Sequence, residues 1–242
     1  MGLIPKEELA KMKREKREAK AARKRKENTR SRIVRFLIVC EGTKTEPNYF
    51  KALIKDRQSE VREIKEEDIK GEGCSTCALV KRALELKYDL EKRRQLPFDR
   101  VWVVFDKDEF QDFNDAIRLA NSKKVSCAWS NEAFELWYYL HFEYLDTGIT
   151  RQQYIEKLER EIRKRMDNEA FKYEKNDSSM YALLKMFGNE EFAKGNAIKL
   201  RKKFRGNQDY QSHTPCTMVD KLVDELENTQ AVLDKISSRE NK

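Results

Sequence analysis

The sequence predicts an α/β protein whose parallel β-sheet is covered by helices on both faces. Between residues 33 and 142, strand-like and helix-like segments alternate. The two strongest strands, 33–40 and 101–105, are continuous apolar runs rather than alternating patterns. Continuous runs are typical of strands buried on both faces, and intervening helices are typical of parallel strands. A chain of 242 residues can also bury a sizeable core without disulfide bonds.

Apolar spacing and Gly or Pro breaks predict the individual elements of this part. A stripe that includes Leu79, Ala83 and Leu90 predicts the longest helix, which ends before Pro97. In order, we expect strand 33–40, helix 48–57, a weaker and charged edge strand 61–69, helix 76–94, strand 101–105, helix 110–121, strand 125–129 and helix 131–142.

Beyond residue 148 the sequence contains no convincing strand pattern. Helical spacing instead predicts helices over 151–166, 180–187, 190–204 and 217–237. These patterns divide the chain into a tail, an α/β domain and a helical region that packs on the site. The expected boundaries are 1–32, 33–147 and 148–242.

The first 30 residues carry nearly all of the net charge. They contain twelve Lys or Arg and five Glu, so that +7 of the chain's +8 lies in this tail. With few large apolar residues, the tail is expected to be a solvated helix or disordered. Its cations could follow a phosphate backbone, with the run Arg23, Lys24, Arg25 and Lys26 as candidates. A solubilising or partner-binding arm is the alternative.

Composition excludes several classes of protein. No stretch approaches the 18 apolar residues of a membrane span, and the N-terminus lacks the apolar centre of a signal peptide. Five cysteines without paired spacing indicate a reducing cytoplasm. Cys74 and Cys77 form a CxxC pair, but no second pair of zinc ligands accompanies it. We interpret it as an incidental pair at a helix start, with a redox or metal role as the alternative.

Acidic residues follow the two strongest strands at the point where each ends. Glu41 and Gly42 follow the first strand, and Asp106-Lys-Asp108 follows the other. The carboxyl ends of parallel strands lie at one edge of a sheet, where ligands of α/β proteins collect. Close carboxylates need a counter-charge, and Mg²⁺ or Mn²⁺ prefers their oxygens. The sequence therefore predicts a divalent metal site at this edge.

The motifs around these acids resemble known families. "CEG" after one strand and "FDKD" after a later one resemble the Toprim fold of topoisomerases, primases and overcoming-lysogenization-defect (OLD) nucleases. Four longer blocks, "FLIVCEGTKTEPNYFKAL", "VWVVFDKDEF", "SNEAFELWYYLHFE" and "TPCTMVDKLVDEL", resemble the RloB family of restriction-linked, Toprim-like defence proteins. The resemblance covers about residues 33–230 and omits the basic tail.

The resemblance implies a metal-dependent nuclease in anti-phage defence, acting with an ATPase partner. By similarity to OLD nucleases, Glu41, Asp106 and Asp108 would hold one divalent ion. Those nucleases use a Ser-x-Glu motif after a further strand for a second metal. Ser130 and Glu132 match that motif here.

Two further positions follow from the same resemblance. OLD nucleases place a lysine near the scissile phosphate, for which Lys175 is the candidate and Lys172 and Lys185 compete. They also place a second acid four residues after the first. Here that position is Thr45, and Glu46 follows it, so Glu46 is a candidate ligand at a different spacing.

The segment 131–142 leaves several roles open. Glu135 could support the metal ligands or be an ordinary polar position. His141 could act in acid–base chemistry or pack in the core. Its aromatic neighbours could stack on bases, but their helical spacing favours the core. They are Trp137, Tyr138, Tyr139 and Phe142.

These observations predict a metal-dependent phosphodiester hydrolase, with RNA such as tRNA slightly preferred over DNA. Lys44 and Lys107, adjacent to the acidic motifs, are expected to contact nucleic acid together with the tail. The alternatives are a non-catalytic Toprim-like module that regulates a partner ATPase or restriction complex, and a nucleotidyl or phosphoryl transferase. The chain has no GxxxxGK[ST] motif, so nucleotide hydrolysis would occur on another chain. Whether the protein forms an oligomer is left open.

Overall fold

The computed structural model describes residues 13–18, 33–57, 62–74, 76–107 and 111–240. The chain divides into two compact units, Met1–Ile33 and Val34–Lys242. In the first unit, residues 13–18 are helical, and Arg14 pairs with Glu18 at 3.0 Å. The four candidate cations of the tail, Arg23, Lys24, Arg25 and Lys26, lie outside the described residues.

The second unit contains a mostly parallel sheet with the strand order β2-β1-β4-β5-β6. Strands β1 to β5 run parallel to their neighbours, and β3 also pairs with β1. Only β6 is antiparallel, to the end of β5, among the described strands. The bounds are β1 Val34–Cys40, β2 Arg62–Glu63, β3 Ile69–Gly71, β4 Arg100–Asp106, β5 Ser126–Asn131 and β6 Cys216–Thr217.

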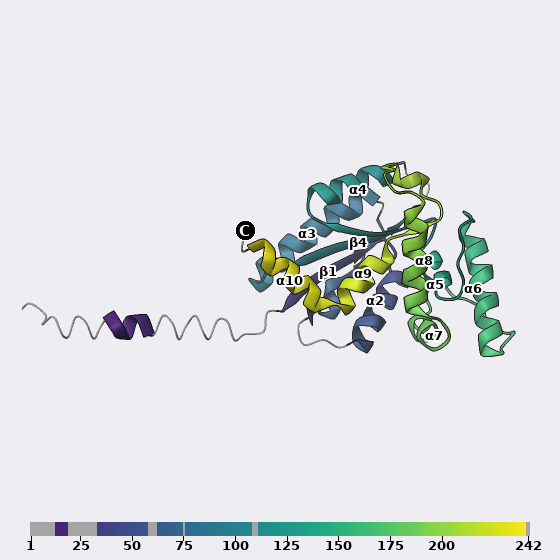
Figure 1. Ribbon diagram of the computed structural model, residues 1–242, viewed down its shortest axis with the longest axis horizontal. Helices are drawn as coiled ribbons and strands as arrows, with labels where there is room; N and C mark the ends of the chain where they lie inside the picture. Colours follow the sequence, from purple (N-terminus) through teal and green to yellow (C-terminus); the bar gives the residue numbers. More distant parts are fainter. Residues whose placement is uncertain (1–12, 19–32, 58–61, 75, 108–110, 241–242) are drawn as a thin grey trace, which may run out of the picture. The chain divides into compact units, whose positions relative to one another are not determined.

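Helices cover both faces of this sheet, as the continuous apolar strands require (Figure 1). One face, with Leu37, Val103 and Phe105, packs against α3 and α4. The other face packs against the remaining helices, including those of the C-terminal part of the chain. The bounds are α2 Thr45–Asp56, α3 Thr76–Arg94, α4 Phe113–Ser122, α5 Glu135–Leu140, α6 Arg151–Met166, α7 Met180–Phe187, α8 Glu190–Lys202, α9 Val219–Glu227 and α10 Thr229–Glu240.

The structure confirms the predicted fold class, an α/β protein with a mostly parallel sheet, consistent with a Toprim-like fold. Two details of the prediction for the region beyond residue 148 were wrong. The region beyond residue 148 does contain a strand, β6, which is too short for a periodic pattern. The helix expected over 217–237 is two helices, α9 and α10, broken at Asn228.

Smaller differences concern the ends of the elements that carry the acidic residues and of the neighbouring edge strands. Helix α2 begins at Thr45 rather than 48, so Glu46 lies in its first turn. Strand β5 continues to Asn131, and α5 begins only at Glu135. The charged segment 61–69 forms two short strands, β2 and β3, on either side of a 3-10 turn, Glu66–Asp68.

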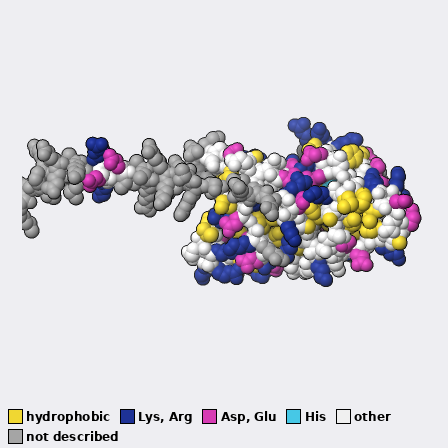
Figure 2. Space-filling view, turned by 90° about the horizontal axis from the view of Figure 1, so that it is seen from below, with side chains coloured by type: hydrophobic (Ala, Val, Ile, Leu, Met, Phe, Trp, Pro, Cys, Tyr) yellow, Lys and Arg dark blue, Asp and Glu magenta, His cyan; other side chains and the backbone are white. Residues whose placement is uncertain are grey.

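The surface of the described part mixes charges of both signs. Figure 2 shows dark-blue cations and magenta acids interspersed on one face, with apolar side chains between them. No helix of the described residues combines the length and the apolar composition needed to cross a membrane.

Candidate functional site

The ends of β1 and β4 bring Glu41 and Asp106 together. The backbone N–H of Glu41 donates to the carbonyl oxygen of Val104 at 2.8 Å, which extends the pairing of the two strands. The backbone N–H of Asp106 donates to Oε2 of Glu41 at 3.1 Å. The Asp106 side chain is buried at the carboxyl edge of the sheet. Two of the predicted metal ligands therefore lie at one point.

Glu46 points back from the first turn of α2 toward the loop after β1. A Cβ atom at Gly42 would lie 2.0 Å from Oε2 of Glu46, so only glycine leaves room for this carboxylate. Glu46 is 6% exposed, and no donor in the described part of the chain bonds its Oε2 atom. Such an orphaned buried oxygen is costly, which marks the position as one that needs a cation or a donor.

Glu135, at the start of α5, is a further acid of this cluster. Its side chain is 2% exposed, and its Oε1 atom accepts a hydrogen bond from the Tyr173 hydroxyl at 3.0 Å. Of the two roles considered for Glu135, the structure favours support of the acidic cluster. The hydrogen bond fixes one oxygen of the carboxylate and leaves the other toward Arg151.

Arg151, the first residue of α6, contacts two of these acids. Its Nη2 atom lies 3.0 Å from Oδ2 of Asp106, and its Nε atom lies 4.0 Å from Oε2 of Glu135. The Arg151 side chain is 34% exposed, so it reaches the cluster from the solvent side.

The electrostatics of the cluster disfavour the charged forms of Asp106 and Glu46. Burial first, and then the negative charges of Glu46 and Glu135, raise the pKa of Asp106 well above its ordinary value, while Arg151 opposes this. Burial also raises the pKa of Glu46; the charge of Glu135 adds to it, and Lys175 and Arg151 oppose it. Burial is thus the main reason why these carboxylates resist ionisation, and their mutual repulsion adds to it.

Of the three candidate lysines, Lys175 lies near the acids. Its charge acts on Glu46, and its backbone carbonyl accepts a hydrogen bond from the Thr45 hydroxyl. Thr45, at the position where OLD nucleases have an acid, thus fixes the loop that carries Lys175. Lys185 instead binds Asp56 at 2.5 Å, and Lys172 is exposed on the loop before Lys175.

The two residues of the Ser-x-Glu motif have different surroundings, although Ser130 is the register partner of Asp106 in the sheet. Ser130 is fully buried, and its hydroxyl lies 2.9 Å from that of Thr217 on β6. Glu132 is half-buried, and its charge raises the pKa of Tyr154, after the larger effect of burial. Because β5 continues through Asn131, the helix begins later than predicted, and Glu135 rather than Glu132 acts on Asp106.

The remaining predicted residues are partly described. Asp108 lies outside the described residues. Lys107 is half-buried, and its backbone N–H donates to the Ser130 carbonyl at 2.9 Å. Lys44 is exposed immediately before α2. Both lysines therefore flank the acidic cluster along the chain.

The aromatic residues of the segment 131–142 are core residues. Trp137, Tyr138, Tyr139 and Phe142 are all buried. His141 is buried as well, and its Nδ1 atom lies 2.9 Å from the Trp137 carbonyl oxygen. Burial lowers the pKa of His141 to about 4. The packing role of His141 is thus favoured over acid–base chemistry.

Among the described residues, no group of three potential metal ligands includes a thiol of the CxxC pair. Both thiols are free, and burial raises the pKa of Cys74. Burial and the neighbouring Asp112 raise the pKa of Cys77 to about 11. Asp112 also accepts hydrogen bonds from the Thr76 hydroxyl at 2.7 Å and the Cys77 N–H at 3.0 Å. The pair therefore belongs to the start of α3.

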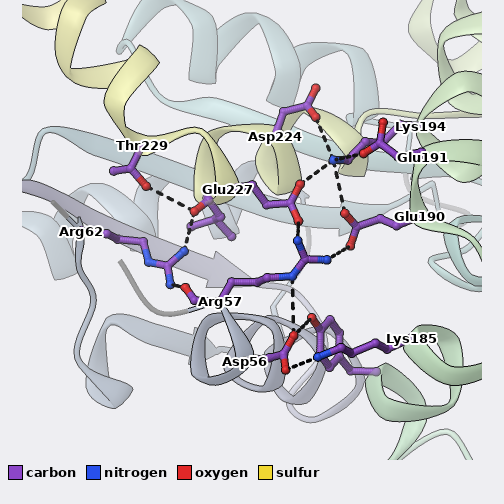
Figure 3. A network of polar contacts seen from close by, with 12 residues as sticks. Asp56, Arg57, Arg62, Lys185, Glu190, Glu191, Lys194, Asp224, Glu227 and Thr229 are labelled. Atoms are coloured by element: carbon purple, nitrogen blue, oxygen red, sulfur yellow. Dashed lines mark hydrogen bonds and ion pairs between the residues drawn. The ribbon is translucent and has the colours of Figure 1, made fainter. Parts of the chain in front are cut away.

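A second carboxylate cluster lies between α8 and α9 (Figure 3). Glu190, Glu191 and Glu227 each offer an oxygen within 4.8 Å of the others, a grouping that the described strand-end acids do not match. Cations already fill it: Lys194 lies 3.2, 3.1 and 2.5 Å from these three acids. Arg57 lies 2.6 Å from Glu227. Sequence inspection did not single out this cluster.

Arg151 and Tyr173 were not predicted as partners of the acids, and the role of Glu135 was left open. The sequence did contain one indication that Arg151 has an acidic partner elsewhere: a cation in the first turn of a helix opposes the helix dipole. This α6 turn contains no acid. Nothing in the spacing of Tyr173 indicates its contact, because it comes from an irregular segment.

Comparisons with known proteins identify a family. The family model described as "RloB-like protein" matches residues 36–226, which is most of the chain. No curated protein and no solved structure matches. The matched range contains the strand-end acids, Arg151 and Lys175, and it begins after the basic tail. The chain belongs to the RloB-like protein family, as its motifs predicted.

Proposed function

We propose that this protein is a divalent-metal-dependent phosphodiester hydrolase that cuts nucleic acid, with RNA such as tRNA preferred. The observation that carries the proposal is the under-compensated cluster of acids at the carboxyl edge of the sheet. Its Glu46 Oε2 atom is buried without a donor among the described residues, and its Asp106 has a strongly raised pKa.

These residues fit Mg²⁺ or Mn²⁺. The available ligand atoms are carboxylate oxygens, which hard divalent ions prefer. Asp106 and Glu46 would hold the ion, together with Glu41, whose carboxylate is aligned by the Asp106 backbone N–H. A bound divalent ion would supply Lewis acidity and a counter-charge for phosphate.

The chain's own residues would orient the substrate. Glu135, held by Tyr173, would keep the geometry of the acidic cluster. Lys175, on the loop fixed by Thr45, would offset negative charge that grows on the phosphate. Lys44 and Lys107 would contact flanking phosphates.

The biological setting follows from the family and stays a proposal. We propose that the protein acts in the cytoplasm in anti-phage defence with an ATPase partner. The basic tail would add nucleic-acid affinity. Asp108, outside the described residues, would join Glu41 and Asp106 on the first ion. Ser130 and Glu132 would matter only for a second ion.

The test is a digest of labelled tRNA, single-stranded RNA and plasmid DNA with Mg²⁺, Mn²⁺ or EDTA, with and without the partner. The wild type should cut at least one substrate only with metal, and Asp106→Ala should lower the rate by about 10³-fold or more. Glu191→Gln is the matched control, because its exposed carboxylate belongs to the other cluster. Equal cutting by Asp106→Ala would reject the assignment.

Binding without any cutting would favour the non-catalytic module instead. In that case, deletion of residues 1–32 should remove most of the affinity for nucleic acid. Transfer of a nucleotidyl or phosphoryl group to an acceptor other than water would favour the transferase.

A further inference from the structure

Arg151 occupies a position that its own helix does not favour. It is the first residue of α6, directly after the N-cap Thr150, whose hydroxyl oxygen accepts a hydrogen bond from the Gln153 N–H at 3.3 Å. A positive side chain at a helix N-terminus is unfavourable, because it lies beside the positive end of the helix dipole. Two acids of the strand-end cluster, Asp106 and Glu135, lie near this cation and offset the unfavourable position.

The contact with Asp106 uses an atom that a divalent ion would need. Arg151 Nη2 lies 3.0 Å from Oδ2 of Asp106, and Asp106 is 7% exposed. A metal ion on that carboxylate would place two further positive charges beside the guanidinium. Like charges at such short range repel strongly where little water screens them.

Glu135 and the solvent both lie near the displaced guanidinium. Glu135 keeps one oxygen bonded to Tyr173, and its other oxygen is 4.0 Å from Arg151 Nε. The Arg151 side chain is one-third exposed, so it can turn outward. An incoming phosphodiester carries the charge that the guanidinium has lost, and the planar fork of arginine binds two phosphate oxygens at once.

We propose that Arg151 exchanges partners: it neutralises Asp106 before the metal binds, and it binds a substrate phosphate afterwards. The inference rests on the proposed metal-dependent function. Arg151 therefore competes with the metal for Asp106 but cooperates with it in binding nucleic acid. A purely structural ion pair would do neither.

The first test measures Mn²⁺ affinity by calorimetry without nucleic acid, at pH 8.5 to limit competition from protons. Arg151→Ala should bind Mn²⁺ about tenfold more tightly than the wild type, because the competing cation is gone. Arg151→Lys, which keeps the charge, should remain close to the wild type. Arg160→Ala is the control, since Arg160 is exposed on the same helix. Unchanged or weaker affinity in Arg151→Ala overturns the proposal.

The second test measures binding of labelled tRNA with EDTA and with Ca²⁺, used as a hard oxygen-liganded probe. With EDTA, Arg151→Ala and the wild type should bind alike. With Ca²⁺, Arg151→Ala should bind about tenfold more weakly, and its salt slope should fall by about 1. Arg151→Lys should lie between them. Equal losses under both conditions overturn the proposal.

These readouts separate the inference from the proposed function. If the wild type binds tRNA with Ca²⁺ but cuts no substrate with Mg²⁺ or Mn²⁺, the hydrolase assignment fails. The affinities of the Arg151 variants for Mn²⁺ and for tRNA still decide the role of Arg151 in that case. Circular dichroism and thermal melts of the two Arg151 variants exclude unfolding as the cause.

Discussion

Two clusters of carboxylates in this protein differ in how they are neutralised. Between α8 and α9, Lys194 contacts Glu190, Glu191, Asp224 and Glu227 within 3.4 Å. At the strand ends, Arg151 approaches Asp106 and, more distantly, Glu135, while Glu46 keeps a buried oxygen without a donor in the described part. Close oxygens alone therefore do not identify a metal site. The proposed metal site is instead the cluster whose buried oxygen, on Glu46, has neither a donor nor an ion pair among the described residues, whereas Glu227 Oε1 has Arg57 at 2.6 Å.

The pKa directions show how the lysine of one cluster and the acids of both clusters respond to burial. Burial would lower the pKa of Lys194, but its hydrogen bonds with Glu227 and Glu191 raise it instead, so the ammonium stays charged. At the strand ends, burial and neighbouring acids raise the pKa of Asp106, so its charged form is disfavoured. Burial likewise raises the pKa of Glu227, which Lys194 opposes, so the two clusters differ in the number of close cationic contacts among the described residues rather than in the direction of their acids' pKa shifts.

The largest expected effect comes from breaking the balanced cluster. Lys194→Met should leave several acids without their common cation and destabilise the protein by about 3 kcal/mol. For a unit of this size, the melting temperature should fall by roughly 6–12 °C. Lys202→Met, exposed on the same helix, should change it little. A melting temperature of Lys194→Met equal to that of the wild type would mean that this cluster is not held by its lysine.

A somewhat smaller effect is expected when Glu46 is forced out of the strand-end cluster. A Cβ at Gly42 would lie 2.0 Å from Glu46 Oε2, so Gly42→Ala should weaken Mn²⁺ binding about tenfold or more. Calorimetric titration measures this change. Retained Mn²⁺ affinity in a folded Gly42→Ala protein would remove Glu46 from the ligand set.

Asp106→Asn should stabilise the metal-free protein at neutral pH by about 1 kcal/mol. Because the folded pKa of Asp106 is raised, its stabilising contribution is present below the unfolded pKa near 4 and is lost as pH rises through the folded value. The melting temperatures of the wild type and Asp106→Asn in EDTA should therefore agree at pH 4. By pH 8 the melting temperature of Asp106→Asn should be the higher of the two. A variant that is less stable at pH 8 contradicts this sign.

The smallest effect is expected at Gly195, the glycine beside Lys194. A Cβ there meets nothing within 4 Å, so Gly195→Ala should stabilise α8 by roughly 0.5–1 kcal/mol. Mn²⁺ affinity should not change. This variant is the matched control for Gly42→Ala, and a loss of Mn²⁺ binding here would move the metal site to the α8–α9 cluster.

The sequence predicted those features that local patterns determine. Continuous apolar runs located β1 and β4, and the acids that follow them were found because strand ends are predictable. The role of Glu135 could not be predicted because the direction of its side chain depends on where α5 begins. Helix α5 begins only at Glu135, since β5 continues to Asn131. Strand β6 has two residues and therefore no periodicity, and it is recognised only by its antiparallel pairing with the end of β5. Arg151 meets Asp106 across 45 residues, a contact that no local pattern contains.

The most direct test of the account is Mn²⁺ binding by the wild type, Asp106→Asn and Glu191→Gln, measured by calorimetry under identical conditions. The account predicts that Glu191→Gln binds Mn²⁺ like the wild type and that Asp106→Asn loses measurable binding. Loss of binding in Glu191→Gln together with unchanged binding in Asp106→Asn would contradict it, because the ion would then bind the cluster that the chain already neutralises.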